Sequence, residues 1–145
     1  MNITPINILL VEDNEGDILL TTEALEEGKI PKSLKVIRDG SSMLIYLGEI
    51  AEKSPSDLPD LILLDINLPK KNGHEVLKKV KNNKLLQHIP IIMLTTSSSE
   101  IDVLKSYQEH ANCYLIKPME IGDFIQVVTK IEEFWLNLVK LPKML

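Results

Sequence analysis

Five polar side chains, each at the end of an apolar run, have the types that phosphoryl chemistry needs. Glu12 and Asp13 follow INILLV, Asp65 follows LILL, Thr95 ends IIMLT and Lys117 follows YLI. Carboxylates bind hard divalent cations, while a hydroxyl and an ammonium can hold phosphoryl oxygens. An aspartate carboxylate can also act as the nucleophile and become an acyl phosphate. Whether these residues form one site depends on the elements that carry them.

The pattern of apolar residues predicts five strands and five helices in strict alternation. We expect strands at 6–12, 34–39, 60–65, 90–96 and 112–117, and helices at 14–29, 40–53, 73–84, 97–110 and 120–138. This alternation implies an α/β fold with a parallel sheet covered on both faces. Right-handed crossovers favour the doubly wound, flavodoxin-like order 2-1-3-4-5.

In this fold ligands bind beyond the carboxyl ends of the strands, where the strand order reverses between strands one and three. Strands often end in polar residues as they leave a core, and for a single residue that explanation is sufficient. For five such residues at matching strand ends, a shared site explains more. Three carboxylates against one ammonium leave negative charge that a divalent cation would neutralise. All-oxygen ligands favour Mg²⁺, with Mn²⁺ as a substitute, over zinc.

Composition excludes several other classes of protein. A chain of 145 residues fits one domain, which we expect over 1–145, with a core at 6–131 and an extended C-terminal helix and tail at 132–145. No apolar run approaches a membrane span, the N-terminus lacks the features of a signal peptide, and a cytoplasmic location is expected. The net charge of −5 disfavours nucleic acid as a partner. The single cysteine excludes an internal disulfide.

The motifs LLVEDN, LILLDINLPKKNG, IIMLTTS and YLIKP occur in the order and at the spacing of a known family. The sequence resembles the receiver domains of two-component response regulators, the CheY-like superfamily. The resemblance implies that Glu12 and Asp13 hold Mg²⁺ together with Asp65 and the backbone carbonyl of Asn67. It also implies that Asp65 accepts a phosphoryl group from a sensor histidine kinase or a histidine phosphotransfer protein.

Further roles follow from the same resemblance. Thr95 is expected to be the switch hydroxyl that moves towards the phosphoryl group, and Lys117 the lysine that binds it. Tyr114 matches the aromatic switch residue, although an ordinary half-buried strand tyrosine would leave the same signal. The bond Lys117–Pro118 is expected to be cis. The implied protein is a stand-alone phosphoacceptor that switches the surface of its fourth helix (97–110), fifth strand (112–117) and fifth helix (120–138), and it is not a multiple-turnover enzyme.

Two other functions use similar residues. A phosphatase of the haloacid dehalogenase type needs a second acid two residues after its nucleophile, and Asn67 stands there. A pseudo-receiver that only binds proteins has no need of all five site residues. A DNA-binding regulator is disfavoured because no region remains for a separate DNA-binding domain.

The C-terminal stretch IEEFWLNLVKLP resembles the endings of single-domain receivers associated with phytochrome kinases. The expected last helix continues its apolar stripe from Phe124 and Ile131 to Trp135 and Leu138. Phe134, Trp135 and Leu138 then suggest a symmetric homodimer contact. The alternative is that Trp135 folds back on its own domain.

Two helices carry further expectations. Asn14 is expected to cap the helix at 14–29, and Asp17 is interpreted as an ordinary acid of its first turn. The apolar face of the helix at 97–110 is expected to consist of Ile101, Leu104 and either Tyr107 or Gln108.

Overall fold

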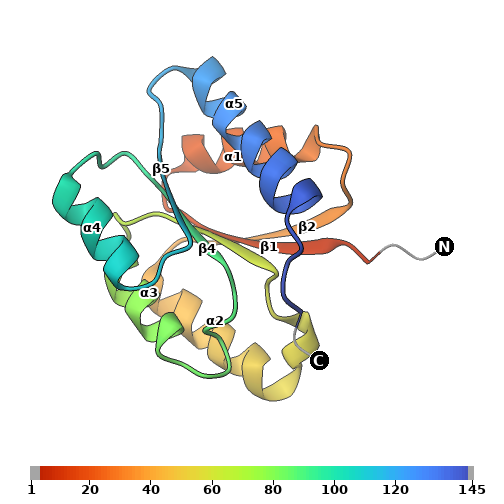
Figure 1. Cartoon of the computed structure of the whole chain (residues 1–145), viewed down its shortest axis with the longest axis vertical. Coiled ribbons are helices and arrows are strands. Elements are labelled where there is room, and N and C mark those ends of the chain that lie inside the picture. The colour runs from red at the N-terminus through yellow and green to blue at the C-terminus, as the bar shows by residue number, and fades with distance from the viewer. Residues whose placement is uncertain (1–3, 144–145) are drawn as a thin grey trace.

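The computed structural model describes residues 4–143 and has the expected alternating architecture (Figure 1). Its strands are β1 (Ile6–Val11), β2 (Lys32–Ile37), β3 (Leu61–Leu64), β4 (Ile91–Thr95) and β5 (Cys113–Ile116). Its helices are α1 (Glu15–Glu26), α2 (Gly40–Lys53), η1 (Pro55–Asp57), α3 (Gly73–Lys81), α4 (Glu100–Gln108), α5 (Ile121–Ile131) and η2 (Glu132–Leu138). Within 4–143, no helix is both long and apolar enough to cross a bilayer.

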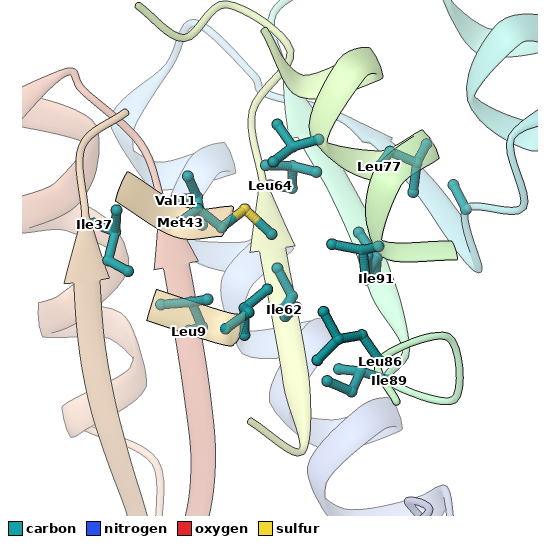
Figure 2. Close-up of a cluster of buried hydrophobic side chains, with 14 of the residues drawn as sticks. Leu9, Val11, Ile37, Met43, Ile62, Leu64, Leu77, Leu86, Ile89 and Ile91 are labelled. Atoms are coloured by element: carbon teal, nitrogen blue, oxygen red, sulfur yellow. The ribbon is translucent and has the colours of Figure 1, made fainter. Parts of the chain in front are cut away.

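The five strands are parallel and lie in the order β2-β1-β3-β4-β5, so the predicted doubly wound sheet is confirmed. Successive strand residues point to opposite faces of a sheet, and each face therefore has its own core. Leu9, Ile62 and Ile91 pack with the helices α2 and α3 (Figure 2). The other face, which includes Ile8 and Leu63, packs against α1 and α5 (Figure 1).

Short capping side chains start the helices that follow strands β1, β3 and β4. The carbonyl of the Asn14 side chain accepts a hydrogen bond from the backbone N–H of Asp17 at 2.9 Å, which confirms the predicted cap of α1. Asn72 caps α3 and Ser99 caps α4 in the same way. A cap satisfies a backbone donor that the helix leaves unpaired and fixes where the first turn begins. Side chains of these first turns therefore face the carboxyl edge of the sheet.

The helix predicted at 120–138 is continuous, but its second half is not an α-helix and does not keep the predicted apolar stripe. The α-helix α5 ends at Ile131, and Glu132–Leu138 form a π-helix, closed by a 2.8 Å bond from Val139 N–H to the Phe134 carbonyl. A π turn places residues five apart on one face, so Leu136 replaces Trp135 as the core residue after Ile131. Leu138 is 77% exposed rather than part of the stripe.

The start of the π-helix is held by a nearly buried ion pair. Lys32 Nζ lies 2.5 Å from Glu132 Oε1 and also donates to the Leu25 carbonyl at 2.7 Å. The Glu132 carboxylate lies over Gly28, where an added Cβ would meet Glu132 Oε2 at 1.5 Å. The pair and the missing side chain at Gly28 together fix the segment against the α1–β2 connection.

The apolar face expected of α4 does not pack into the core of the described residues. Ile101 is 77% exposed and Leu104 is 58% exposed, and the only buried residue of the helix is Ser106. Amphipathic spacing shows that a helix has an apolar side, but it does not show what covers that side.

Gly73 is required by a close approach of the chain beside the carboxyl edge. A Cβ there would lie 2.3 Å from the Asp65 carbonyl oxygen and 2.7 Å from Ile66 Cα. We expect Gly73→Ala to lower the free energy of unfolding by about 2 kcal/mol, because backbone must move. Gly48→Ala is the matched control, since nothing lies within 4 Å of an added Cβ and alanine favours the helix by about 1 kcal/mol. Urea unfolding of both variants checks the prediction, which fails if Gly73→Ala is as stable as the native chain.

Candidate functional site

The parallel ladder brings the predicted site residues to one edge of the sheet. Backbone hydrogen bonds continue beyond the strands, from Asp65 N–H to the Val11 carbonyl at 3.1 Å and from Lys117 N–H to the Thr95 carbonyl at 2.7 Å. Neighbouring strands end at the same level, so Glu12 lies beside Asp65, Thr95 and Lys117 at the carboxyl ends of the strands. The structure therefore brings these predicted residues together at one end of the sheet.

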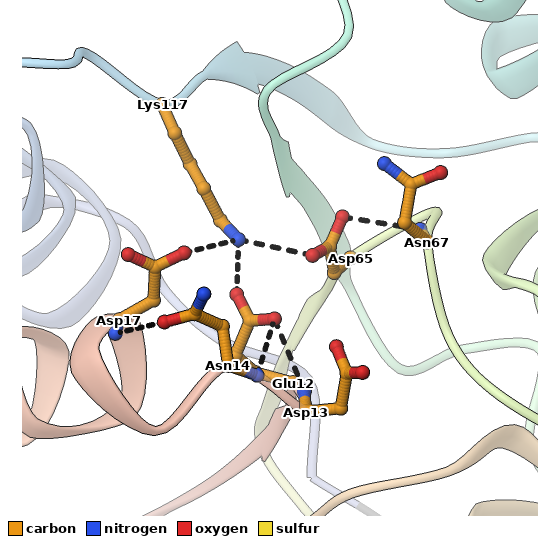
Figure 3. Close-up of polar contacts among 7 residues, drawn as sticks. All are labelled: Glu12, Asp13, Asn14, Asp17, Asp65, Asn67 and Lys117. Atoms are coloured by element: carbon orange, nitrogen blue, oxygen red, sulfur yellow. Dashed lines mark hydrogen bonds and ion pairs between the residues drawn. The ribbon is translucent and has the colours of Figure 1, made fainter.

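The Lys117 ammonium is the centre of this site (Figure 3). Its Nζ donates to Asp65 Oδ2 at 2.9 Å, to Asp17 Oδ2 at 2.9 Å and to Glu12 Oε1. The Lys117 and Glu12 side chains are each 3% exposed. Three carboxylates thus accept the three hydrogens of one buried ammonium.

Burial and charge shift the pKa values of these groups in different directions. Burial raises the pKa of Glu12 to about 7, against the opposing effect of Lys117. Burial also acts to raise the pKa of Asp65, but its contact with Glu12 and the Lys117 charge outweigh burial and bring that pKa below its usual value. Burial disfavours the charged form of Lys117, yet the surrounding carboxylates raise its pKa. The ammonium is charged and Asp65 is an ionised carboxylate at neutral pH.

Glu12, Asp13 and Asp65 can direct one carboxylate oxygen each to a common point, since these atoms all lie within 4.8 Å of one another. Asp13 is exposed, whereas the other two are buried, so the cluster opens to solvent on one side. Glu12 is oriented through its other oxygen, which accepts the backbone N–H groups of Asp13 and Asn14 at 3.1 and 3.3 Å. Asn67 lies beside the cluster, with its backbone N–H 3.2 Å from Asp65 Oδ1. These oxygen donors fit a hard divalent cation.

Thr95 is fully buried, and its hydroxyl lies near enough to Asp65 to help lower the pKa of that carboxyl, although it makes no hydrogen bond of regular geometry within the described residues. A hydroxyl can rotate to donate to another nearby acceptor. Thr95 is the last residue of β4 and directly precedes the loop 96–99. This loop forms hydrogen bonds with β5 and α4. The Tyr114 hydroxyl donates to the Ser97 carbonyl at 2.9 Å, and Ser97 Oγ donates to Asp102 Oδ2 at 2.6 Å. The half-buried Tyr114 is therefore linked to the loop after β4.

The structure corrects two expectations about this edge. No peptide bond within the described chain is cis, so the expected cis bond at Lys117–Pro118 is wrong. An X–Pro bond prefers trans by about 0.5–1 kcal/mol, and in trans Lys117 already reaches all three of its carboxylates. Asp17 is not an ordinary first-turn acid, because it contacts Lys117. Its position in the first turn after β1 was the available signal, since that turn begins at the carboxyl edge.

A second residue that the sequence did not reveal is His74. Its side chain is 6% exposed at the start of α3, and its Nε2 lies 3.2 Å from Asp102 Oδ1 in α4. His74 therefore extends the Ser97–Asp102 contact to a third element. A histidine at a helix start gives no sequence signal for such a pair.

The fold is of the five-stranded doubly wound α/β class, with an acidic cluster and a buried lysine at the carboxyl ends of its strands. The profile of the response regulator receiver domain matches residues 8–129. The response regulator Rcp1 of Synechocystis sp. is 47% identical over 135 residues, which are 93% of this chain and 92% of that protein. The chain belongs to the response regulator receiver domain family, and it is a phosphoacceptor of two-component signalling rather than a classical enzyme.

Two solved structures share nearly the whole fold. The phosphorylated cyanobacterial phytochrome response regulator RcpA has a TM-score of 0.91 and 44% identity, covering 97% of this chain and 100% of that one. The Mn²⁺-bound form of Rcp1 has a TM-score of 0.89 and 46% identity, covering 95% of this chain and 99% of that one. The chain is thus similar in sequence and structure to phytochrome response regulators.

Proposed function

We propose that Asp65 is the residue that accepts the phosphoryl group, from a histidine kinase or a histidine phosphotransfer protein. The observation that carries the proposal is a buried aspartate at the switch point of the sheet, 2.9 Å from a buried ammonium and within 4.8 Å of two further carboxylates. A carboxylate oxygen of Asp65 forms the new O–P bond while the P–N bond of the phosphohistidine breaks. The imidazole leaves with the electron pair of that bond.

Lys117 neutralises charge on the phosphoryl oxygens during this transfer, and the Thr95 hydroxyl donates a hydrogen bond to one of these oxygens. Mg²⁺, for which Mn²⁺ can substitute, would be held by Glu12, Asp13, Asp65 and the backbone carbonyl of Asn67. When bound, the ion supplies further positive charge to the phosphoryl oxygens. The Mn²⁺-bound form of the similar protein Rcp1 supports this assignment.

The signal leaves the site through Thr95 and the loop 96–99. A shift of Thr95 towards a phosphoryl group draws on Ser97, whose carbonyl accepts from the Tyr114 hydroxyl and whose own hydroxyl donates to Asp102. These contacts connect the site to the surface of α4, β5 and the start of α5. That surface exposes several large apolar side chains, Ile101, Leu104, Ile116, Met119 and Ile121. A local charge event therefore acts on a surface suited to protein binding.

The similarity to phytochrome response regulators supports a phytochrome-type histidine kinase as the partner. We further propose that the chain works as one receiver domain over 1–145, in the cytoplasm, with no membrane or nucleic-acid partner. The net charge of −5 supports the last point.

The full chain with Mg²⁺ and acetyl phosphate tests this function. We expect its intact mass to rise by one phosphoryl group, because acetyl phosphate offers the same phosphoryl electrophile as phosphohistidine. Chelation of the cation with EDTA should prevent the gain. A chain that gains no mass with Mg²⁺ would overturn the proposal.

A symmetric homodimer through the C-terminal segment is part of the proposal. β5 is an edge strand, and an apolar hollow of about 520 Å³ lies between it and the helices α5 and η2. Phe134 and Trp135 line this hollow with their ring centroids 5.6 Å apart. Trp135 also packs against the core, as the alternative expectation has it, whereas Phe134 and Leu138 are 47% and 77% exposed.

Phe134→Ser should weaken the dimer at least tenfold, roughly the effect of losing one aromatic anchor. Light scattering of the full chain over a dilution series measures the change. Leu19→Ser is the control, because Leu19 is 57% exposed on α1, away from β5. A chain that is monomeric at every concentration, or one equally weakened by both changes, would contradict the dimer.

A further inference from the structure

Asp17 contacts the site without belonging to its cation-binding group. Its Oδ2 lies 2.9 Å from Lys117 Nζ, and its side chain is 26% exposed. The Asn14 cap holds its backbone N–H at 2.9 Å, which fixes the turn that carries it. Figure 3 shows Asp17 on the α1 side of Lys117, with Asp65 on the opposite side. The contact is therefore built by the helix cap and does not depend on the other acids.

The three carboxylates that hold Lys117 have different further roles. Glu12 and Asp65 each have an oxygen within the cluster that can bind a divalent cation, and Asp17 has none there. A cation drawn to that cluster competes with Lys117 for Glu12 and Asp65, because a carboxylate oxygen facing a cation loses much of its attraction for an ammonium. Asp17 is then the one carboxylate of the three that remains for the ammonium alone.

We propose that Asp17 is a positioning residue for Lys117. It holds the ammonium at the edge of the site while Glu12 and Asp65 bind the cation, and so it keeps Lys117 beside the phosphoryl group without blocking the ion. The inference rests on the proposed roles of Lys117 and of the cation cluster. It assigns to Asp17 no contact with phosphate or metal.

Mn²⁺ binding to the full chain, measured by titration calorimetry, tests the inference without any phosphorylation. Asp17→Ala should weaken Mn²⁺ binding about tenfold, because the released ammonium returns to Glu12 and Asp65, and one charge-assisted hydrogen bond is of that size. Glu15→Ala is the matched control: it removes an acid from the same first turn, where its partner is the exposed Arg38. We expect it to change the affinity less than about twofold, as exposed pairs contribute little.

The same two substitutions in a Lys117→Met background separate positioning from simple charge. If Asp17 acts through Lys117, Asp17→Ala should then weaken Mn²⁺ binding no more than Glu15→Ala does. An unchanged tenfold effect in that background, or no effect in the native chain, would overturn the inference. Failure of acetyl phosphate to modify Asp65 would overturn the proposed function instead, and would leave this binding cycle interpretable.

A kinetic measurement adds a readout that a merely structural role would not move. At saturating Mg²⁺, Asp17→Ala should slow phosphorylation by acetyl phosphate about tenfold, because a mispositioned ammonium no longer meets the phosphoryl group. The thermal midpoint of the cation-loaded variant should match that of Glu15→Ala. A rate equal to that of Glu15→Ala would contradict the positioning role.

Discussion

Lys117→Met should lower the free energy of unfolding of the metal-free protein by about 3 kcal/mol, the size expected when one partner of a buried ion pair is removed. The native ammonium contacts three carboxylates, and two of these, Glu12 and Asp65, have side chains that are 3% and 8% exposed. Methionine fills a similar volume but leaves these carboxylates without a counter-charge. The loss therefore comes from charge and not from a cavity.

A divalent cation should reverse most of this loss. In Lys117→Met no ammonium competes with Mg²⁺ for these carboxylates. Mg²⁺ should therefore stabilise the variant more than it stabilises the native chain. Saturation at about 100 times the dissociation constant contributes about 2.7 kcal/mol. Urea unfolding with EDTA and with Mg²⁺ measures both effects.

The control for Lys117→Met is Arg38→Met, which breaks the exposed pair with Glu15. It should change stability little and show no special response to Mg²⁺, because both side chains remain hydrated. If Lys117→Met were as stable as Arg38→Met in EDTA, the ammonium would not be the counter-charge of the site.

Asp65→Asn should abolish the mass gain with acetyl phosphate and Mg²⁺ while the protein stays folded. An amide oxygen is a poor nucleophile, and the new side chain fills the same space. The substitution also removes one of the carboxylates that repel one another around Lys117. Intact mass after incubation, with the thermal midpoint measured in parallel, separates loss of the acceptor from loss of the fold.

Asp60→Asn is a closely matched control, because Asp60 lies at the opposite end of the same strand. Asp60 is 6% exposed, accepts the Asn7 N–H at 2.8 Å and pairs with Lys143 at 3.2 Å. Since Asp60 precedes β3 and Asp65 follows it, only Asp65 reaches the carboxyl edge. Asp60→Asn should gain a phosphoryl group as the native chain does. Equal gains in the two variants would show that the phosphoryl group lies elsewhere.

The strand order could be predicted from the alternation of strands and helices. The positions of the site residues could also be predicted, because each of them ends or follows a predicted strand. Asp65 and Lys117 directly follow apolar runs, and a parallel sheet brings such positions together whatever the details of packing. The strand order alone was enough to predict that Glu12 would lie near Asp65 and Lys117. The family motifs then gave these positions their expected roles.

The features that the sequence did not predict depend on three-dimensional neighbours. The role of Asp17 depends on the direction in which α1 leaves β1, and first-turn acids are common in helices without any partner. The exposure of Ile101 depends on what lies outside α4. The π-helix at Glu132–Leu138 begins with an ion pair to Lys32, a hundred residues earlier in the chain. Periodicity alone contains none of this information.

The number of residues per turn in the π-helix decides which side chains of the C-terminal segment face the core and which face outwards. In an α-helix, residues three and four positions after Ile131 would turn Phe134 and Trp135 towards the core. The wider turn assigns the core position to Leu136 and leaves the aromatic pair at the hollow beside β5. The wider turn thus lets one helix pack Leu136 into the core and place Phe134 and Trp135 at the hollow beside β5. A change in turn width after α5 alone can therefore alter the lateral surface of the domain while the residues around Asp65 keep their arrangement.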